Sequence, residues 1–273
     1  MEDNAGFSMM PTGKNYICNM KLFVKEQSGV REIWGQSDTI LLIFAGASAE
    51  FALNKAVDWL YFTGRLPADP LARLFSTVSY SRQILLSENE AALRAIDKIT
   101  SIHSAVEKNR GDQIPDWAYR DVLFMLIDYS IRSFELVQRK LSLQEKEEVF
   151  RVFYRVGERM GLKGLPVDYD AWLQMRNEHL QNNVVKSEFT VDLYKQYKKH
   201  LGAFRYLLLL EGQKLVVPKR VKELLRLNGF SVSRPLLGLY KLLRRFKMDW
   251  FFKSILLPTE YIKEVRELDV VQK

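Results

Sequence analysis

The chain has 273 residues, of which 47% are apolar and 27% charged, with a net charge of +8 and one cysteine, Cys18. This composition is typical of a globular protein, and a single cysteine excludes an intramolecular disulfide, which fits a reducing, cytoplasmic compartment. The longest apolar run near the start, residues 39–49, is too short to span a bilayer as a helix, which needs about 20 residues.

The first segment of the chain lacks a clear pattern. Residues 1–30 show no periodicity and are predicted to form an N-terminal arm whose apolar side chains can dock on the body of the protein. From residue 31 to residue 273 we predict a single helical domain. Ser37 and Asp38 are suited to cap its first helix, and a second helical segment, residues 56–62, ends at Gly64.

Most of the remaining chain has the 3.6-residue apolar period of helices that are separated by short loops. The predicted helices cover residues 71–86, 117–140, 169–181, 190–211 and 235–252, a short helix that Pro218 opens and that ends near residue 228, and two helices that begin at capping boxes in residues 87–90 and 142–145. Strand alternation, internal repeats and low-complexity linkers are absent. The sequence therefore predicts an all-α fold, a single compact multi-helix domain.

The standard motifs of several enzyme and binding classes are missing from the sequence. It has no glycine-rich phosphate loop, no Cys-x-x-Cys or His-Glu-x-x-His zinc pattern and no Gly-x-Ser-x-Gly elbow. The three histidines, His103, His179 and His200, leave few possible members for a catalytic triad or a multi-histidine metal site. No helix-turn-helix or ribonucleoprotein motif occurs, so we expect no nucleic-acid partner.

Asp128 lies in the very apolar stretch 122–131, where an unpaired carboxylate would be costly to bury. We therefore predict that Asp128 is buried and paired with a basic residue, either Arg132 or Arg73. The pair is either a structural ion pair at i,i+4 or part of a polar cluster in a pocket. Arg73 and Thr77 lie one turn apart, which by spacing alone indicates a helix face with one salt bridge.

The three histidines differ in their surroundings along the sequence. His103 lies on the apolar stripe of its predicted helix, where a lone histidine is more often a hydrogen-bonded core residue than a ligand. His179 and His200 follow polar residues, and both can be solvated.

The C-terminal third of the chain is basic. Residues 191–273 carry +10, which leaves −2 on the first 190 residues. Residues 235–252 place Leu236, Leu239, Leu243 and Phe246 on one side of a helix that is rimmed by lysine and arginine. Such a helix suits a membrane surface, and hence a peripheral membrane location, or the rim of a lipid pocket. The alternative is a core-packing helix with snorkelling basic side chains.

The order of these segments resembles the MpaB-type and latex-clearing (rubber) oxygenase family. The pieces that carry the resemblance are residues 33–38, 69–77, 102–106, 126–135, 147–161 and 256–258. No single piece is specific, and the shared order carries the match over about residues 32–260.

The resemblance implies an all-helical oxygenase, an oxidoreductase, whose partner is a hydrophobic small molecule of isoprenoid or lipid-like type. One alternative is a non-catalytic relative that binds a lipid or isoprenoid after losing haem. A third is a membrane-surface or partner-binding protein that uses the basic helix.

The same resemblance implies site residues. By position, Arg73 and Thr77 match the family's Arg-x-x-x-Thr near the cofactor, and Asp128 matches its helix aspartate, so these three are the implied catalytic residues. Characterised rubber-cleaving members use haem b with an axial histidine. The family's Trp-x-His pattern, which is taken to supply that ligand, falls on residues 121–123, where Leu123 cannot bind iron.

A member without the usual ligand histidine would need another one to hold haem iron. His103 matches the family's Ile-His motif and is ranked first as a haem and iron ligand. His200 is ranked second, because the residues that follow it are apolar and small. His179 is ranked last, because it lies among polar residues.

Overall fold

The computed structural model describes residues 22–64, 68–227 and 237–238. Its helices are α1 (Gly29–Trp34), α2 (Ser37–Phe51), α3 (Asp58–Phe62), α5 (Pro70–Leu86), α6 (Asn89–Arg110), α7 (Asp116–Val137), α8 (Leu143–Arg159), α9 (Tyr169–Asn182), α10 (Glu188–Val216) and α11 (Lys219–Leu225). Two isolated β-bridges are the only extended pairings within these described ranges. The predicted all-α fold is confirmed. The predicted helix 235–252 and the 256–258 match lie outside the described residues, apart from positions 237 and 238.

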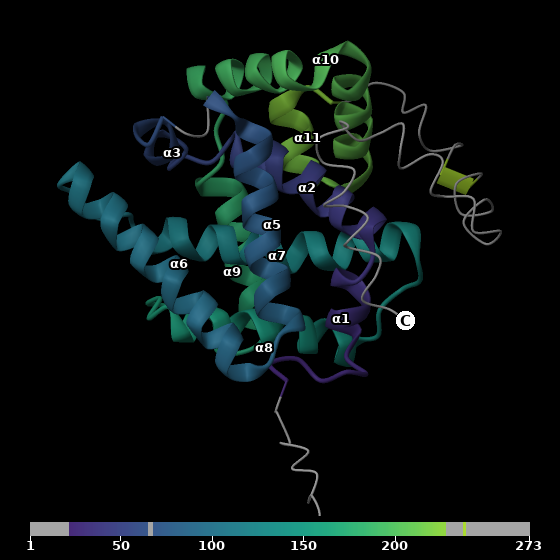
Figure 1. The fold of residues 1–273 in the computed structure, drawn as a ribbon. Coiled ribbons are helices and arrows are strands. Elements are labelled where there is room, and N and C mark those ends of the chain that lie inside the picture. The colour runs from purple at the N-terminus through teal and green to yellow at the C-terminus, as the bar shows by residue number, and fades with distance from the viewer. Residues whose placement is uncertain (1–21, 65–67, 228–236, 239–273) are drawn as a thin grey trace, which may run out of the picture.

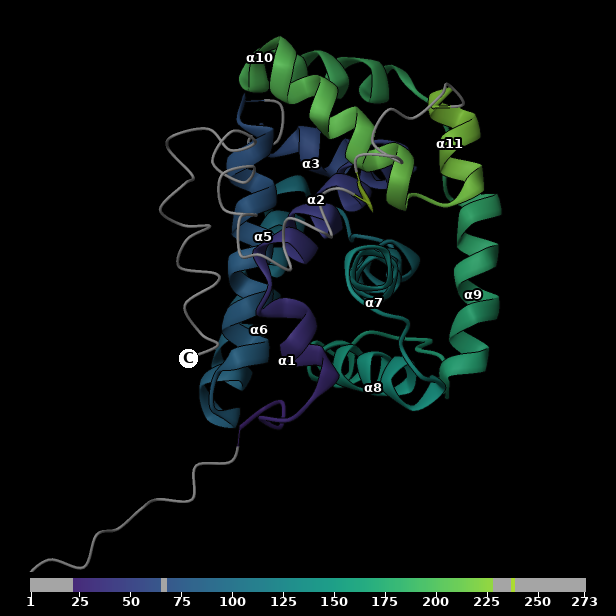
Figure 2. The same ribbon diagram turned by 90° about the vertical axis from the view of Figure 1, so that its right-hand side faces the viewer.

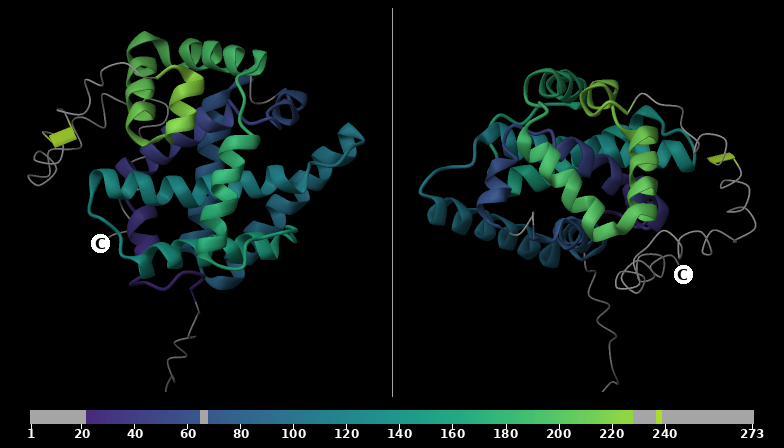
Figure 3. Two further views of the ribbon diagram at one scale, coloured as in Figure 1. Left: turned by 180° about the vertical axis from the view of Figure 1, so that it is seen from behind. Right: turned by 90° about the horizontal axis from the view of Figure 1, so that it is seen from above.

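Helix α7 forms the centre of the molecule. Figure 2 looks nearly along its axis, with α9 on one side, α2 above it and α8 below it, and each of these three helices packs against α7. Seen from behind, α9 lies across α7 (Figure 3). The central position explains why the sequence of α7 is apolar on nearly all sides: Phe124, Ile127, Tyr129 and Phe134 are all buried in the main core.

A glycine allows α2 to approach α7 closely. A Cβ added at Gly46 would clash with the ring of Tyr129, so no side chain fits at this position. The close approach matters for the site described below, because it brings the end of α2 against the middle of α7.

One of the two predicted capping boxes is observed, whereas the other box and the predicted cap of α2 are not. Ser142 and Glu145 form the predicted box at the start of α8. The box predicted at residues 87–90 is wrong, since α6 begins at Asn89 after Glu88. The backbone there is tied to the N-terminal segment instead, because Phe23 N donates to Ser87 O at 3.1 Å. Capping of α2 by Ser37 and Asp38 is also wrong, because both residues lie inside the helix.

Helix α10 is longer than predicted and bent. Its backbone leaves the helical region at Gly202, where φ is 72° and ψ is 171°. This left-handed φ favours glycine, so the bend is fixed by the residue type. Figure 1 shows the two arms of α10 on the outside of the molecule. No helix within the described ranges is long and apolar enough to cross a bilayer.

Candidate functional site

A cluster of buried polar side chains lies where α2, α7 and α9 meet. Glu50 of α2 is fully buried, and Arg176 and His179 of α9 are only 3% and 2% exposed. Helix α9 is less apolar than α7, but its buried residues Trp172, Arg176 and His179 recur at helical spacing and form one stripe. This stripe faces the core, so two of the charged groups of α9 must find partners there.

Arg176 bridges two carboxylates. Its Nη1 and Nη2 both donate to Glu50, with Nη2 lying 2.7 Å from Oε2. Its Nε and Nη2 also donate to Oδ2 of Asp128, at 3.1 and 2.9 Å. The second oxygen of Asp128 accepts from Nε of Arg132 at 2.6 Å. The planar guanidinium therefore joins α2, α7 and α9 through fork-like hydrogen bonds that an ammonium group could not reproduce.

His179 extends the cluster to a third carboxylate. Its Nε2 lies 2.9 Å from Oε1 of Glu50, and its Nδ1 lies 2.6 Å from Oδ2 of Asp121. The second contact is short but poorly aligned for a hydrogen bond, so we describe it as an ion pair. Tyr129 donates its hydroxyl to Glu50 at 2.8 Å, and Asn183 donates to Asp121 at 3.1 Å. We call this set the ion-pair network: Glu50, Asp121, Asp128, Tyr129, Arg132, Arg176, His179 and Asn183.

The charges of the ion-pair network balance when His179 is protonated. Burial alone would lower the pKa of His179, but the carboxylates of Asp121 and Glu50 outweigh burial and raise it. Burial alone would raise the pKa of Glu50, but Arg176 and His179 outweigh it and lower that pKa to about 2. Three carboxylates then face two guanidiniums and one imidazolium. With His179 protonated, the arrangement is a charge-balanced structural core that joins three helices.

Asp128 is buried and paired with Arg132, as predicted. The prediction missed Arg176, the second and more buried partner. It also missed Glu50 and Asp121, and the idea that His179 is solvated is wrong. His179 is buried because it belongs to the inward stripe of α9.

The remaining predicted site residues lie on other helices. Arg73 is on α5, and its side chain lies outside the described part of the structure. Thr77 is half-buried on the same helix, and its backbone carbonyl accepts from Ser81 Oγ at 3.0 Å. His103 is half-buried on α6, with its ring edge-on to that of Tyr119 of α7 at a centroid distance of 5.2 Å. His200 is exposed on α10, two residues before the bend.

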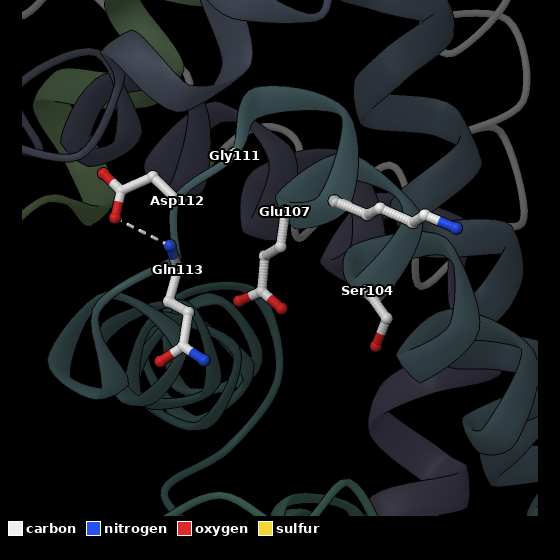
Figure 4. Close-up of a pocket in the computed structure, with 6 residues that line it drawn as sticks. Ser104, Glu107, Gly111, Asp112 and Gln113 are labelled. Atoms are coloured by element: carbon white, nitrogen blue, oxygen red, sulfur yellow. Dashed lines mark hydrogen bonds between the residues drawn. The ribbon is translucent and has the colours of Figure 1, made fainter.

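A shallow, open depression lies near His103, at the end of α6. Its lining includes Ser104, Glu107, Lys108 and Asp112, as Figure 4 shows. Glu107 is held in place because its Oε1 accepts from the hydroxyl of Tyr119 at 3.1 Å and from Ile114 N at 2.9 Å. Sites for apolar ligands are lined mainly by apolar and aromatic side chains. This polar depression therefore does not suit an isoprenoid.

The histidines differ in how well they could hold haem iron. Both ring nitrogens of His179 face carboxylates, which favour its protonated form, whereas an iron ligand must be a neutral imidazole with one nitrogen free. His200 is on the open surface, so it cannot reach a dry pocket. His103, half-buried against the ring of Tyr119, is the one of the three that is neither placed between carboxylates nor exposed. Across the described ranges, no group of three or more histidine, cysteine, aspartate or glutamate side chains could hold a metal ion.

Leu123 occupies the position of the expected ligand pattern and is packed in the core. A Cβ added at the facing Gly157 would lie 2.8 Å from Cδ2 of Leu123, so α7 and α8 are in tight apolar contact here. No flat ring could enter at this point without separating the two helices.

Comparison with known proteins gave one match. A family model described as "ER-bound oxygenase mpaB/B'/Rubber oxygenase, catalytic domain" matches residues 31–247, which is well over half of the chain. No curated protein and no solved structure matched the chain.

Proposed function

The chain belongs to the mpaB/rubber oxygenase catalytic-domain family, and from this premise we propose that it is an oxygenase acting on a hydrophobic small molecule of isoprenoid or lipid-like type. The observation that carries the proposal is the family match over residues 31–247. The all-helical fold agrees with it. We also propose a reducing, cytoplasmic location for the protein, on the basis of its single cysteine.

The proposed cofactor is haem b, since the family is a haem-dependent oxygenase type. His103 would hold the iron through one ring nitrogen, while a hydrogen bond fixes the other. Arg73 and Thr77 are proposed on the cofactor side because they match the family's Arg-x-x-x-Thr pattern. Helix α5, which carries both, packs against α6, which carries His103. The bound haem would supply the activation of dioxygen.

Asp128 has a positioning role in this proposal rather than a role at the reacting atoms. Helix α7 carries Asp121 and Asp128, which belong to the ion-pair network, and also Tyr119, which contacts the ring of His103. The network therefore fixes the register of the helix whose Tyr119 orients the proposed ligand. Glu107 adds to this restraint by accepting the hydroxyl of Tyr119.

Haem titration tests the cofactor. The purified protein should develop a saturable Soret band, and His103→Ala should abolish it. His200→Ala is the matched control, since it removes an exposed histidine and should leave the band unchanged. Circular dichroism on each variant checks that the helices remain. Absence of a Soret band in the wild type would remove haem from the proposal.

The second candidate function is a non-catalytic relative that binds a lipid or isoprenoid without haem. The observation that favours it is Leu123, an apolar, tightly packed residue where the expected ligand pattern has a histidine. Native mass spectrometry distinguishes the two candidates. A bound lipid without haem supports the second candidate, whereas bound haem supports the first.

A further inference from the structure

The outer face of α10 combines cations with exposed apolar side chains. Residues 193–210 contain four lysine and arginine residues and no aspartate or glutamate. In the first arm, Lys195, Lys198 and Lys199 are exposed, and Val191, which shares their face of the helix, is 45% exposed. The opposite side of this arm buries Leu193 and Tyr197. The first arm is therefore anchored by one face and presents the other to solvent.

The second arm of α10, beyond the bend, carries exposed apolar residues of its own. Phe204 and Leu207 are 58% and 59% exposed, and they lie three residues apart on one side of the helix. The bend at Gly202 places the start of this arm directly after the lysines. In Figures 1 and 2, α10 lies at the outside of the described helices. We call the set Val191, Lys195, Lys198, Lys199, Phe204 and Leu207 the α10 surface.

The three lysines of the α10 surface make no hydrogen bond or ion pair with other residues in the described part of the chain. The nearest acidic groups on α10 are already engaged, since Asp192 accepts from Tyr61 at 3.0 Å and Glu211 pairs with Lys214 at 2.6 Å. With respect to the described residues, the α10 surface therefore carries positive charge that no acidic side chain pairs, and such charge attracts an anionic partner.

We propose that the α10 surface binds an anionic lipid bilayer. Lysines beside the headgroups gain about 1 kcal/mol each from an anionic leaflet. Phe204 and Leu207 can enter the boundary between headgroups and acyl chains, as the apolar residues of interfacial helices do. A nucleic acid would use the lysines alone and leave both apolar side chains in water, so the pairing of the two favours lipid.

This inference does not depend on haem or on oxygenase activity. It is also separate from the membrane contact predicted for residues 235–252, which lie almost wholly outside the described residues. Binding at α10 would bring the protein to a phase in which isoprenoids and lipids dissolve, so it would complement the proposed substrate class.

Vesicle co-sedimentation of the full chain tests the proposal. The protein should sediment with vesicles containing phosphatidylserine and not with vesicles of phosphatidylcholine alone, and 0.5 M salt should weaken the binding. The triple variant Lys195→Gln, Lys198→Gln, Lys199→Gln should weaken binding about 100-fold, which corresponds to three charges near the surface. A matched control replaces three exposed lysines elsewhere by glutamine, at Lys25, Lys108 and Lys163, and should keep nearly full affinity.

A second variant tests the apolar part of the α10 surface. Phe204→Ser with Leu207→Ser should weaken binding while the remaining dependence on salt stays as steep as in the wild type. The proposal is overturned if the wild type does not bind anionic vesicles. It is also overturned if both triple variants lose affinity equally, or if the α10 triple variant binds as the wild type does. The last result would assign membrane binding to another segment.

Discussion

The ion-pair network and the α10 surface carry charge in opposite ways. In the network, Glu50, Asp121 and Asp128 are each paired, and Arg176 and His179, which lie between them, are nearly inaccessible to water. On the α10 surface, three lysines stand in water without a described partner. Burial makes each charge of the network depend on its neighbours, since an unpaired ion is costly inside a protein, whereas solvated lysines are independent of one another. Substitutions in the ion-pair network should therefore lower the free energy of unfolding strongly, whereas substitutions on the α10 surface should affect binding and leave stability nearly unchanged.

The largest effect is expected from Arg176→Met. The substitution leaves Glu50 without its guanidinium and leaves Asp128 with only the half-exposed Arg132, so the free energy of unfolding should fall by about 3–5 kcal/mol. Urea denaturation measures the change. Arg132→Met is the control, because Arg132 is 42% exposed and its loss should cost less than about 1 kcal/mol. Equal effects of the two substitutions would contradict the difference between buried and exposed pairs.

A somewhat smaller loss, about 3 kcal/mol, is expected for Asp128→Ala. Arg176 keeps its contacts with Glu50, but its Nε and Nη2 lose their hydrogen bonds to Asp128. Arg132 loses its hydrogen bond to the same carboxylate. Thermal unfolding followed by circular dichroism checks this value. An unchanged melting temperature would mean that Asp128 contributes no stabilising pair.

The pH dependence of stability should follow His179 and Glu50. The pKa of His179 is raised by folding, so its contribution is complete below the ordinary value of 6.5 and is lost as pH rises through the raised value. The pKa of Glu50 is lowered to about 2, so its contribution is complete above 4.5 and is lost as pH falls toward 2. Stability from this pair should be greatest between about pH 4.5 and 6.5.

Urea denaturation at pH 5.5, 7 and 8.5 measures the alkaline side of that curve. His179→Gln should remove most of the decline above pH 6.5, whereas His200→Gln, at the exposed histidine of α10, should leave the decline as it is in the wild type. A wild-type stability that rises from pH 5.5 to 8.5 would show that His179 is neutral in the folded protein.

The smallest effect is expected on the α10 surface. Replacing Lys195, Lys198 and Lys199 by glutamine should change the free energy of unfolding by less than about 0.5 kcal/mol, because solvated charges without partners contribute little to stability. The same denaturation assay measures it. A loss above 1 kcal/mol would show that these lysines have a structural role and would weaken their assignment to lipid binding.

Helix positions could be predicted because they depend on local patterns. The periods of α5 and α9 gave starts and ends within a residue or so of the observed ones, and Ser142 with Glu145 specified the start of α8. Residues 87–90 have the residue types of a capping box, but no box forms there, because the bridge between Leu22 and Glu88 holds that backbone. A contact between residues 66 positions apart cannot be predicted from a local motif.

The ion-pair network was only partly predictable, because it too depends on contacts between distant parts of the chain. Asp128 stood out because its own neighbours are apolar, and Arg132 lies one turn away. Arg176 and His179 lie in a mostly polar helix, so only their spacing from Trp172 could have revealed them. Which partner faces that stripe depends on how α9 crosses α7, and the sequence of α9 alone does not contain this information.

The span of the network along the chain has a consequence for folding during synthesis. Arg176 lies 126 positions after Glu50 and 48 after Asp128. The cation that pairs with both carboxylates therefore emerges from the ribosome after both of them. Until α9 emerges, α2 and α7 cannot pack together without burying carboxylates that lack most of their partners. Nascent chains that end before residue 170 should therefore remain loosely collapsed. The completion of α9 should be the step at which α2 and α7 pack stably against each other.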